Sequence, residues 1–331
     1  MTFSARHSER GAALITVLMI VAAMSVVAVG LTTTVTSATQ RARALDAQAQ
    51  LRLYTVAAEE VAQVRLGAML GLIEGKATAD LSGLNEVQSI PIDGGLIQVR
   101  VTDATNCFDL NSLILENERG DVQAVPELVT EYITILESTG FSRSDAGALA
   151  SALVDWMDSD STPGIGGAEN GYYSGETPSY RTSGRPLANM TELRAIRGYD
   201  AAAIQAIAGA VCARPVRPGI AERALNINTI TEANAAALAM AFSGAVEVDD
   251  ARQVIRSRPT GGWPDVDTLL REPAFANVAP ELRQLDRLGV VTTHMEVYAE
   301  VAYRDQMTSW LYLFETVPGR PVQTLRRERV G

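Results

Sequence analysis

The sequence is poor in the residues and motifs on which most enzymes depend. Only two histidines occur, His7 near the N-terminus and His294 in a predicted strand, so a histidine-based mechanism has one candidate. No Walker loop, dinucleotide-binding glycine motif or nucleophile elbow is present. Nothing in the chain therefore points to an enzyme.

The chain also lacks a net positive charge, and it has few cysteines. The 331 residues carry a formal net charge of -11, and an acidic surface repels the phosphates of nucleic acids, so we expect no nucleic-acid binding. Cysteine is limited to Cys107 and Cys212. An even count fits a disulfide in an oxidising compartment, which we expect here; two separate buried thiols are the alternative.

An uninterrupted apolar run, Gly11–Leu31 (GAALITVLMIVAAMSVVAVGL), lies near the N-terminus. A helix of about 20 apolar residues spans the hydrocarbon core of a bilayer, where a helix satisfies its own backbone hydrogen bonds. Three interpretations fit. The run is a secretory signal peptide with a cleavage site near Gly30, a plain signal anchor, or a prepilin-like signal cleaved between Gly11 and Ala12, which keeps the helix.

The helical pattern continues beyond this run to about Leu72. No proline occurs between Arg41 and Leu72, and no glycine precedes Gly67 in that stretch. Apolar residues recur at steps of three and four, which is typical of an amphipathic helix: Leu45, Ala49, Leu53, Val56, Val64, Ala68 and Leu72. We expect this stripe to pack on a soluble domain; a membrane anchor followed by a separate surface helix is the alternative.

Two regions far apart in the sequence show strand patterns. Ser89–Ile92 and Leu96–Val101 flank an Asp-Gly turn, which is a hairpin signal, and Pro91 indicates that the first strand lies at an edge. Three further strands are predicted towards the other end, at His294–Arg304, Ser309–Thr316 and Val322–Arg329. We predict one antiparallel sheet, assembled from both ends of the chain and packed on the N-terminal helix.

The region between them, roughly residues 107–290, is helical and rich in alanine, with a faint internal repeat. Cys107–Leu113 (CFDLNSL) is similar to Leu225–Ile230 (LNINTI), and each precedes a helical run. Glu192–Asp200 and Ala251–Pro259 begin segments similar to helix–hairpin–helix units. Such units often bind DNA through glycine amides, but small bundles also use the shape for packing. Because the neighbourhood is not strongly basic, we expect packing.

The stretch with the clearest chemistry is an acidic Gly/Pro loop, residues 155–169 (DWMDSDSTPGIGGAE). Counted from Asp158, the spacing of Asp160, Thr162 and Glu169 matches ligand positions of a calcium loop. Pro163 replaces the glycine that an EF-hand requires, so this is not an EF-hand. Ligands that are all oxygen favour Ca²⁺ over Zn²⁺. We predict a calcium site; a solvated acidic loop and a pair of catalytic carboxylates are the alternatives.

Several of these segments together strongly resemble one family, the K-type minor pseudopilin of the type II secretion system. The similarity covers nearly the whole chain, and the DWMDSDSTP…GAE combination is specific. The segments that carry it are RGAALITVL (10–18), LVDWMDSDSTP (153–163), GAENGYY (167–173), YR (180–181), MTELRAI (190–196) and LNINT (225–229).

The resemblance implies an α+β pseudopilin fold, in which a long N-terminal helix packs on an antiparallel sheet and a large all-α domain is inserted between strands. We accordingly expect five parts: a prepilin leader peptide (1–11), the N-terminal helix with a membrane-embedded first half (12–73), the first part of the sheet (74–106), the inserted helical domain with the acidic loop (107–290), and the second part of the sheet (291–331).

The family also implies processing and ligands. A prepilin peptidase is expected to cleave after Gly11, and Ala12 then becomes the methylated N-terminus. Calcium sites in the helical domain of the family support the calcium prediction here, for which the candidate ligands are Asp158, Asp160, Glu169 and Asp155. Expected partners are the I-type and J-type minor pseudopilins, other pseudopilins and the inner-membrane assembly platform.

Thr16 stands where ordinary pilins carry a glutamate, at the fifth mature position. A carboxylate in hydrocarbon is costly unless it is paired, and in the fibre its partner is thought to be the N-terminal amine of a neighbour. A subunit with nothing ahead of it has no such partner, and K-type proteins lack the acid too. We therefore expect a single-pass inner-membrane protein with a periplasmic domain that becomes the tip of the pseudopilus. A membrane-anchored periplasmic enzyme that uses the acidic loop is the alternative.

Overall fold

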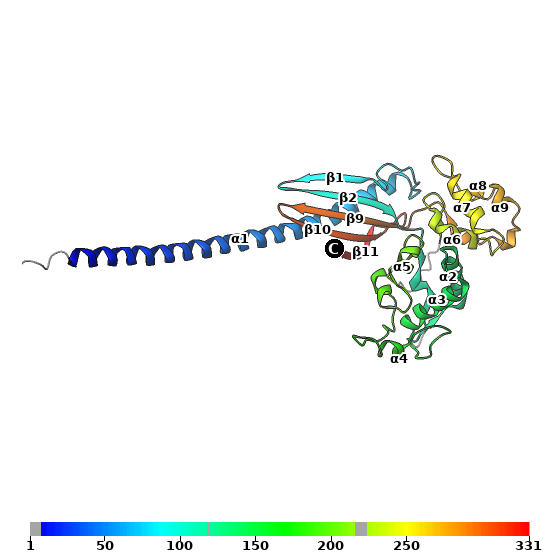
Figure 1. Cartoon of the computed structure of the whole chain (residues 1–331). Helices are drawn as coiled ribbons and strands as arrows, with labels where there is room; N and C mark the ends of the chain where they lie inside the picture. Colours follow the sequence, from blue (N-terminus) through cyan, green and yellow to red (C-terminus); the bar gives the residue numbers. More distant parts are fainter. Residues whose placement is uncertain (1–7, 118–119, 216–223, 331) are drawn as a thin grey trace, which may run out of the picture.

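The computed structural model describes residues 8–117, 120–215 and 224–330, with side chains from residue 13 onward. One helix, α1 (Ser8–Leu72), projects from the body of the molecule as a long stalk (Figure 1). Its first half is apolar and has no cover within the chain. By length and composition, one helix among the described residues could cross a membrane, and it is this one.

The second half of α1 packs on the sheet, but not through the predicted stripe. Val64 of that stripe is 70% exposed, and its other members are also exposed. The buried face carries a different set of apolar side chains: Ala47, Leu51, Ala58, Ala62, Leu66 and Leu70. The prediction was wrong because both faces of the helix are apolar, and Tyr312 and Phe314 of the sheet pack on the face that carries Leu66 and Leu70.

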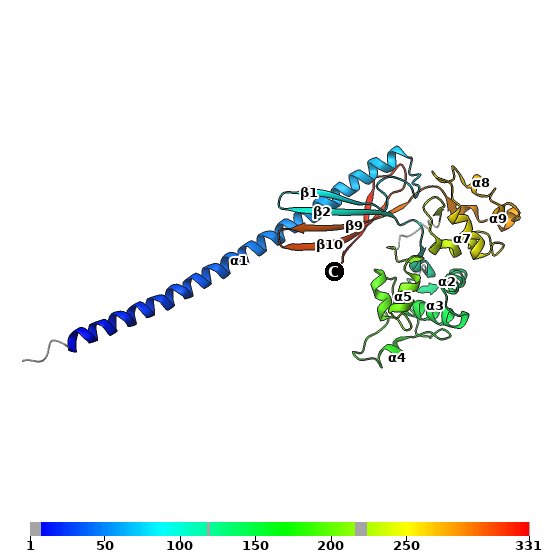
Figure 2. The same ribbon diagram turned by 45° about the horizontal axis from the view of Figure 1, so that its top comes forward.

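The sheet has five antiparallel strands in the order β1-β2-β9-β10-β11. Figure 2 shows α1 running along one of its faces. As predicted, both ends of the chain contribute, and the strand that contains Pro91 lies at an edge. The bounds are β1 (Val87–Ile92), β2 (Gly95–Asp103), β9 (His294–Tyr303), β10 (Gln306–Glu315) and β11 (Gln323–Val330).

The insert between β2 and β9 forms two modules, each with its own apolar core. The first module comprises residues 107–215, with β3 (Phe108–Asp109), η1 (Leu110–Leu113), β4 (Ile114–Glu116), β5 (Val122–Ala124), α2 (Pro126–Ser138), α3 (Arg143–Met157), α4 (Asn170–Tyr173), η2 (Met190–Ala195), α5 (Ala201–Ile207) and β6 (Val211–Cys212).

The second module comprises residues 225–290. Its elements are β7 (Leu225–Asn226), η3 (Glu232–Asn234), α6 (Ala235–Met240), α7 (Val248–Arg256), α8 (Val266–Leu269), α9 (Pro273–Ala276), η4 (Pro280–Leu282), η5 (Leu285–Arg287) and β8 (Leu288–Gly289). The insert is mainly helical, as predicted; its three short strand pairs, β3–β6, β4–β5 and β7–β8, were not predicted.

Both modules open with the same device, which lies at the faint sequence repeat. The first strand of each pairs in parallel with its last, β3 with β6 and β7 with β8. A buried asparagine then binds the peptide of one distant residue. Asn111 accepts from the Leu187 N–H at 2.7 Å and donates to its carbonyl at 2.9 Å. Asn228 does the same with Trp263, at 2.7 and 2.8 Å.

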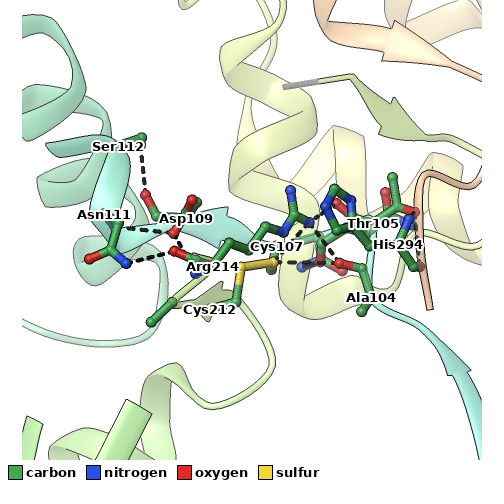
Figure 3. The surroundings of a disulfide bond; sticks show 12 residues. Ala104, Thr105, Cys107, Asp109, Asn111, Ser112, Cys212, Arg214 and His294 are labelled. Carbon is green, nitrogen blue, oxygen red and sulfur yellow. Dashed lines mark hydrogen bonds between the residues drawn. A yellow bond between two sulfur atoms is a disulfide. The ribbon is translucent and has the colours of Figure 1, made fainter. Parts of the chain in front are cut away.

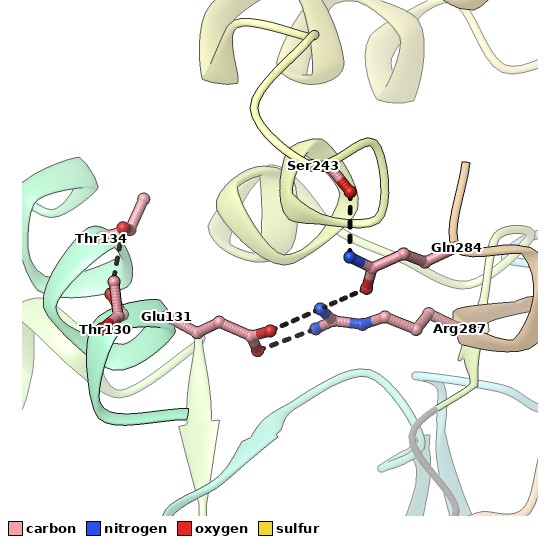
Figure 4. A network of polar contacts seen from close by, with 6 residues as sticks. All are labelled: Thr130, Glu131, Thr134, Ser243, Gln284 and Arg287. Carbon is pink, nitrogen blue, oxygen red and sulfur yellow. Dashed lines mark hydrogen bonds and ion pairs between the residues drawn. The ribbon is translucent and has the colours of Figure 1, made fainter. Parts of the chain in front are cut away.

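A two-pronged ion pair joins the modules. Arg287 of η5 donates to both carboxylate oxygens of Glu131 on α2, at 2.7 and 3.1 Å (Figure 4). Gln284 accepts from the same guanidinium at 3.2 Å and donates to Ser243. A planar guanidinium holding a carboxylate at two points fixes orientation as well as distance, so this contact helps to set how the modules meet, together with the packing of α6 on α2.

Candidate metal site

Two helix ends position the carboxylates of the acidic loop. Helix α3 starts after Ser142, whose hydroxyl accepts from the Asp145 N–H at 3.2 Å, and Asp158 is the residue that caps its C-terminal end. The loop returns to α4, where Glu169 is the N-terminal cap. Both acids are thus held at points where the backbone direction is fixed by regular structure.

Asp158, Asp160 and Glu169 converge, with one oxygen of each within 4.8 Å of the others. Asp158 is 8% exposed and Glu169 6%. Oδ1 of Asp158 and Oε1 of Glu169 are buried and have no hydrogen-bond partner among the described residues. A buried carboxylate oxygen without a donor is costly. The arrangement therefore fits a cation bound by oxygen ligands.

Electrostatics support the same conclusion. Burial, together with the neighbouring charges of Asp160, Glu169 and Asp155, raises the pKa of Asp158 to about 7. Burial is also the main reason why the pKa of Glu169 is raised, and Asp155 and Asp160 add to it. Crowded carboxylates disfavour their own ionised forms, and a divalent cation among them would reverse that effect.

Asp155, the fourth candidate ligand, does not belong to the converging group. Both of its carboxylate oxygens lie 3.1 Å from the Gly164 nitrogen, whose N–H donates to them, and the backbone of Ala168 also donates to this carboxylate. A methyl group on Gly167 would meet its Oδ2 at 2.0 Å. Asp155 therefore shapes the loop from within, and the close approach explains the glycine.

Side chains beyond the acidic loop complete its support. Arg197 donates to the Gly167 carbonyl at 3.0 Å, and its guanidinium lies 4.9 Å from the centre of the Tyr172 ring. Trp156 meets Tyr173 edge to face at 5.2 Å. Sequence reasoning missed Arg197, because it lies in a later segment and no local pattern links it to the loop.

The two cysteines are joined in a disulfide, with 5.7 Å between their Cα atoms (Figure 3). The bond ties the start of the first module to its end, beside the β3–β6 pair. Arg214 donates to the carbonyls of Ala104 and Thr105 at 2.7 and 2.8 Å. His294, the one histidine that a catalytic mechanism could use, lies in this neighbourhood.

The expected processing site lies at the start of α1. Residues 1–7 of the expected leader fall outside the described residues. The backbones of Gly11 and Ala12 are helical, and the side chain of Ala12 is not described. The Thr16 hydroxyl donates to the Ala13 carbonyl at 2.9 Å, so this polar group is satisfied within the helix.

Both hairpin-like segments have chain carboxylates where an external phosphate would bind. Asp200 accepts from the Ala203 N–H at the start of α5, at 2.8 Å. Asp265 accepts from the Thr268 N–H at the start of α8, at 2.8 Å. Helix N-termini attract anions, and these two already hold one from their own chain. This geometry supports packing over nucleic-acid binding.

A long N-terminal helix lying along an antiparallel sheet defines the pilin-like class of protein. Models of the family described as "Type II secretion system (T2SS), protein K" match residues 106–216 and 225–290, which correspond to the two modules. Type II secretion system protein K of Klebsiella pneumoniae is 32% identical over 273 residues, 81% of each chain. The chain belongs to the type II secretion system protein K family.

Two further comparisons agree. Type II secretion system protein K of Pectobacterium carotovorum subsp. carotovorum is 29% identical over 335 residues, 98% of each chain. The crystal structure of the GspK-GspI-GspJ complex from the enterotoxigenic Escherichia coli Type 2 Secretion System contains a chain of the same fold. The TM-score is 0.71 at 24% identity, over 88% of this chain and 99% of that one. The predicted family and fold class are thus confirmed.

Proposed function

We propose that this chain is a structural subunit without catalytic activity, the minor pseudopilin at the tip of the type II secretion pseudopilus. There it helps to initiate or cap assembly, for export of proteins from the periplasm across the outer membrane. The observation that carries the proposal is α1, which runs without a break from an uncovered apolar half into the sheet. Such a stem suits a membrane before assembly and a fibre core afterwards.

The proposed location follows from the same helix. The apolar half would cross the inner membrane once, with the soluble body in the periplasm, after prepilin peptidase has cleaved behind Gly11 and Ala12 has been methylated. Disulfides persist in oxidising compartments such as the periplasm, so the Cys107–Cys212 bond supports this orientation. Mass spectrometry of the membrane-extracted protein should find a methylated Ala12 at the N-terminus; an intact leader would refute the processing step.

The shape of the molecule supports a terminal position in the fibre. The two modules lie beyond the sheet, at the end opposite the apolar half of α1 (Figure 1). That bulk would hinder another subunit from stacking above. We propose the I-type and J-type minor pseudopilins as direct partners, in line with the complex in which the fold relative was solved, and then the other pseudopilins and the assembly platform.

A pull-down in detergent tests the partners. The full chain should retain the I-type and J-type proteins together, and a major pseudopilin offered at the same concentration serves as the matched control. Absence of both minor pseudopilins from the eluate would refute the assignment.

Thr16 tests the tip position. With no subunit ahead, a glutamate there would have no amine partner and would only add the cost of a charge in hydrocarbon. Thr16→Glu should therefore incorporate no better than wild type when fibres are counted by immunogold labelling, with Thr16→Ala as the control. Abundant labelling along the fibre shaft by Thr16→Glu would contradict a tip-restricted subunit.

We further propose that Asp158, Asp160 and Glu169 bind one structural Ca²⁺. A ligand at 100 times its Kd stabilises the folded state by about 2.7 kcal/mol, so calcium should raise the melting temperature of the full chain above that in chelator. Asp158→Asn combined with Glu169→Gln should abolish the rise, whereas Asp267→Asn, an exposed acid of the second module, should keep it. If the wild-type chain melts at the same temperature with calcium and with chelator, the proposed calcium site is refuted.

A further inference from the structure

The turn between α7 and α8 in the second module, residues 257–263, presents the backbone N–H of Gly261 at the surface. Gly261 and Gly262 both have left-handed backbones, with φ of +82° and +73°, and the Gly262 N–H closes the turn on the Pro259 carbonyl at 2.9 Å. Turns of this kind can direct backbone N–H groups towards an anion, and here the Gly261 N–H is the one that points out of the turn. Neither the secretion role nor the calcium site uses this turn.

A carboxylate from a distant part of the chain occupies the turn. Oδ2 of Asp80, in the segment between α1 and β1, accepts from the Gly261 N–H at 3.0 Å. Hydrogen bonds from the Thr78 side chain and from Gly261, with a smaller contribution from the Arg258 charge, lower the pKa of Asp80. The groups around the carboxylate therefore favour its ionised form.

A fixed positive charge lies behind the turn. Arg258 donates to the carbonyls of Ile227 and Ile230 at 3.2 and 2.9 Å, which anchors its guanidinium. Together with the turn it lines a cavity of about 260 Å³, whose walls are Ala79, Asp80, Asn228, Arg258, Pro259, Thr260 and Gly262. The cavity wall offers the Thr260 hydroxyl and the Arg258 cation, and the Gly261 N–H that donates to Asp80 lies beside it; a donor, a hydroxyl and a cation are the chemistry that recognises an oxyanion.

The turn is rigid before any ligand arrives. The Asn228 side chain accepts from the Trp263 N–H and donates to the Trp263 carbonyl. A methyl group on Gly262 would meet the Asn228 side chain at 2.5 Å. The opposite side is fixed independently of Asp80, because Ala79 donates to the Asn228 carbonyl at 3.0 Å and Asn226 donates to the Ala77 carbonyl at 3.0 Å. Removing the Asp80 carboxylate should therefore leave the site standing.

We propose that the turn 257–263 is a binding site for an oxyanion of the carboxylate or phosphate class, and that Asp80 is its resident ligand. In the folded chain the Asp80 carboxylate connects the segment between α1 and β1 to the second module, and it excludes external phosphate from the turn. The segment similar to a helix–hairpin–helix unit thus has its anion-binding turn occupied by a carboxylate of the same chain.

Chemical rescue tests the proposal directly. The full chain is labelled with ¹⁵N-glycine in detergent micelles, and the Gly261 amide is followed by NMR while inorganic phosphate or acetate is added at constant ionic strength. In wild type the resonance should not move. In Asp80→Ala it should shift saturably with either anion in the millimolar range. Asp286→Asn, which removes an exposed acid of the second module away from the turn, should behave as wild type.

Each other outcome overturns the proposal. A Gly261 resonance in Asp80→Ala that ignores both anions would show that the turn is not an oxyanion site. Equal responses in wild type and Asp80→Ala would show that Asp80 does not occupy it. If Asp80→Ala changes the dispersion of the whole spectrum, Asp80→Ser is used in its place, because its side chain is one atom shorter and carries no charge; it should bind phosphate while retaining the wild-type fold.

Discussion

The two insert modules begin alike and then differ in what they carry. Each opens with a short strand that pairs with its own last strand, and each uses one buried asparagine, Asn111 or Asn228, to hold a distant peptide. The first module adds a disulfide and the acidic loop. The second has no cysteine and instead binds the segment that follows α1.

The difference shows where each module needs reinforcement. Carboxylates that are buried together oppose folding, and the module that contains them is also the one with a covalent link between its ends. The second module holds no such cluster among the described residues, and hydrogen bonds to the neighbouring segment suffice. The two modules thus share the strand pair and the buried asparagine at their start. The first then adds an acidic loop suited to an ion, and the second adds a contact with another segment of the chain.

Loss of the disulfide should produce the largest difference in stability between the two modules. Cys107→Ser with Cys212→Ser releases a loop that spans 105 residues, and in the chain-entropy model a loop of that size contributes about 5 kcal/mol. Hydrogen exchange measured by mass spectrometry should accelerate in the first module and change much less in the second. Equal acceleration in both would show that they unfold as one unit.

The asparagines should show how far the modules are equivalent. Asn111→Ala and Asn228→Ala each leave a buried N–H and a buried carbonyl without their partner, at a cost of about 3 kcal/mol. Urea unfolding should give similar losses for the two variants, and Asn277→Ala at an exposed position should be near neutral. If only one of the two variants lost stability, the two asparagines would not have equivalent roles, which would contradict the structural repeat.

The ion pair should report on coupling between the modules. Arg287 is buried and Glu131 partly buried, with side chains 10% and 21% exposed, so breaking the pair should cost about 2 kcal/mol, less than for a fully enclosed pair. Glu131→Gln, Arg287→Met and the double variant form a cycle. The double variant should cost less than the two single costs added; strict additivity would mean that the contact is incidental.

The smallest effect should distinguish residues within the acidic loop. Asp155→Ala removes the acceptor for two loop amides and should cost about 1 kcal/mol with or without calcium. Asp158→Asn should matter only when calcium is present. Melting curves in chelator and in calcium test both variants, and the reverse pattern would exchange the roles of the two acids.

Local patterns predicted much of this molecule because they depend on near neighbours. The extent of α1, the hairpin around Asp93-Gly94 and the convergence of Asp158 with Glu169 all follow from spacing along one segment. The buried face of α1 did not, because apolar residues line both sides of the helix and the choice was made by a sheet formed from later strands. Arg197 reached the acidic loop through tertiary folding alone.

The order of the strands has a consequence for how the chain acquires its shape during synthesis. Asp103, just before the insert, is the register partner of Met295, just after it. The three strands β9–β11 therefore emerge only once both modules have been made. Until then the sheet-facing side chains of α1, such as Leu51 and Leu66, lack the cover that β9 and β10 give them. Because non-local pairing is slow and exposes apolar surface, the modules should fold first, and sheet closure should be the late, aggregation-sensitive step.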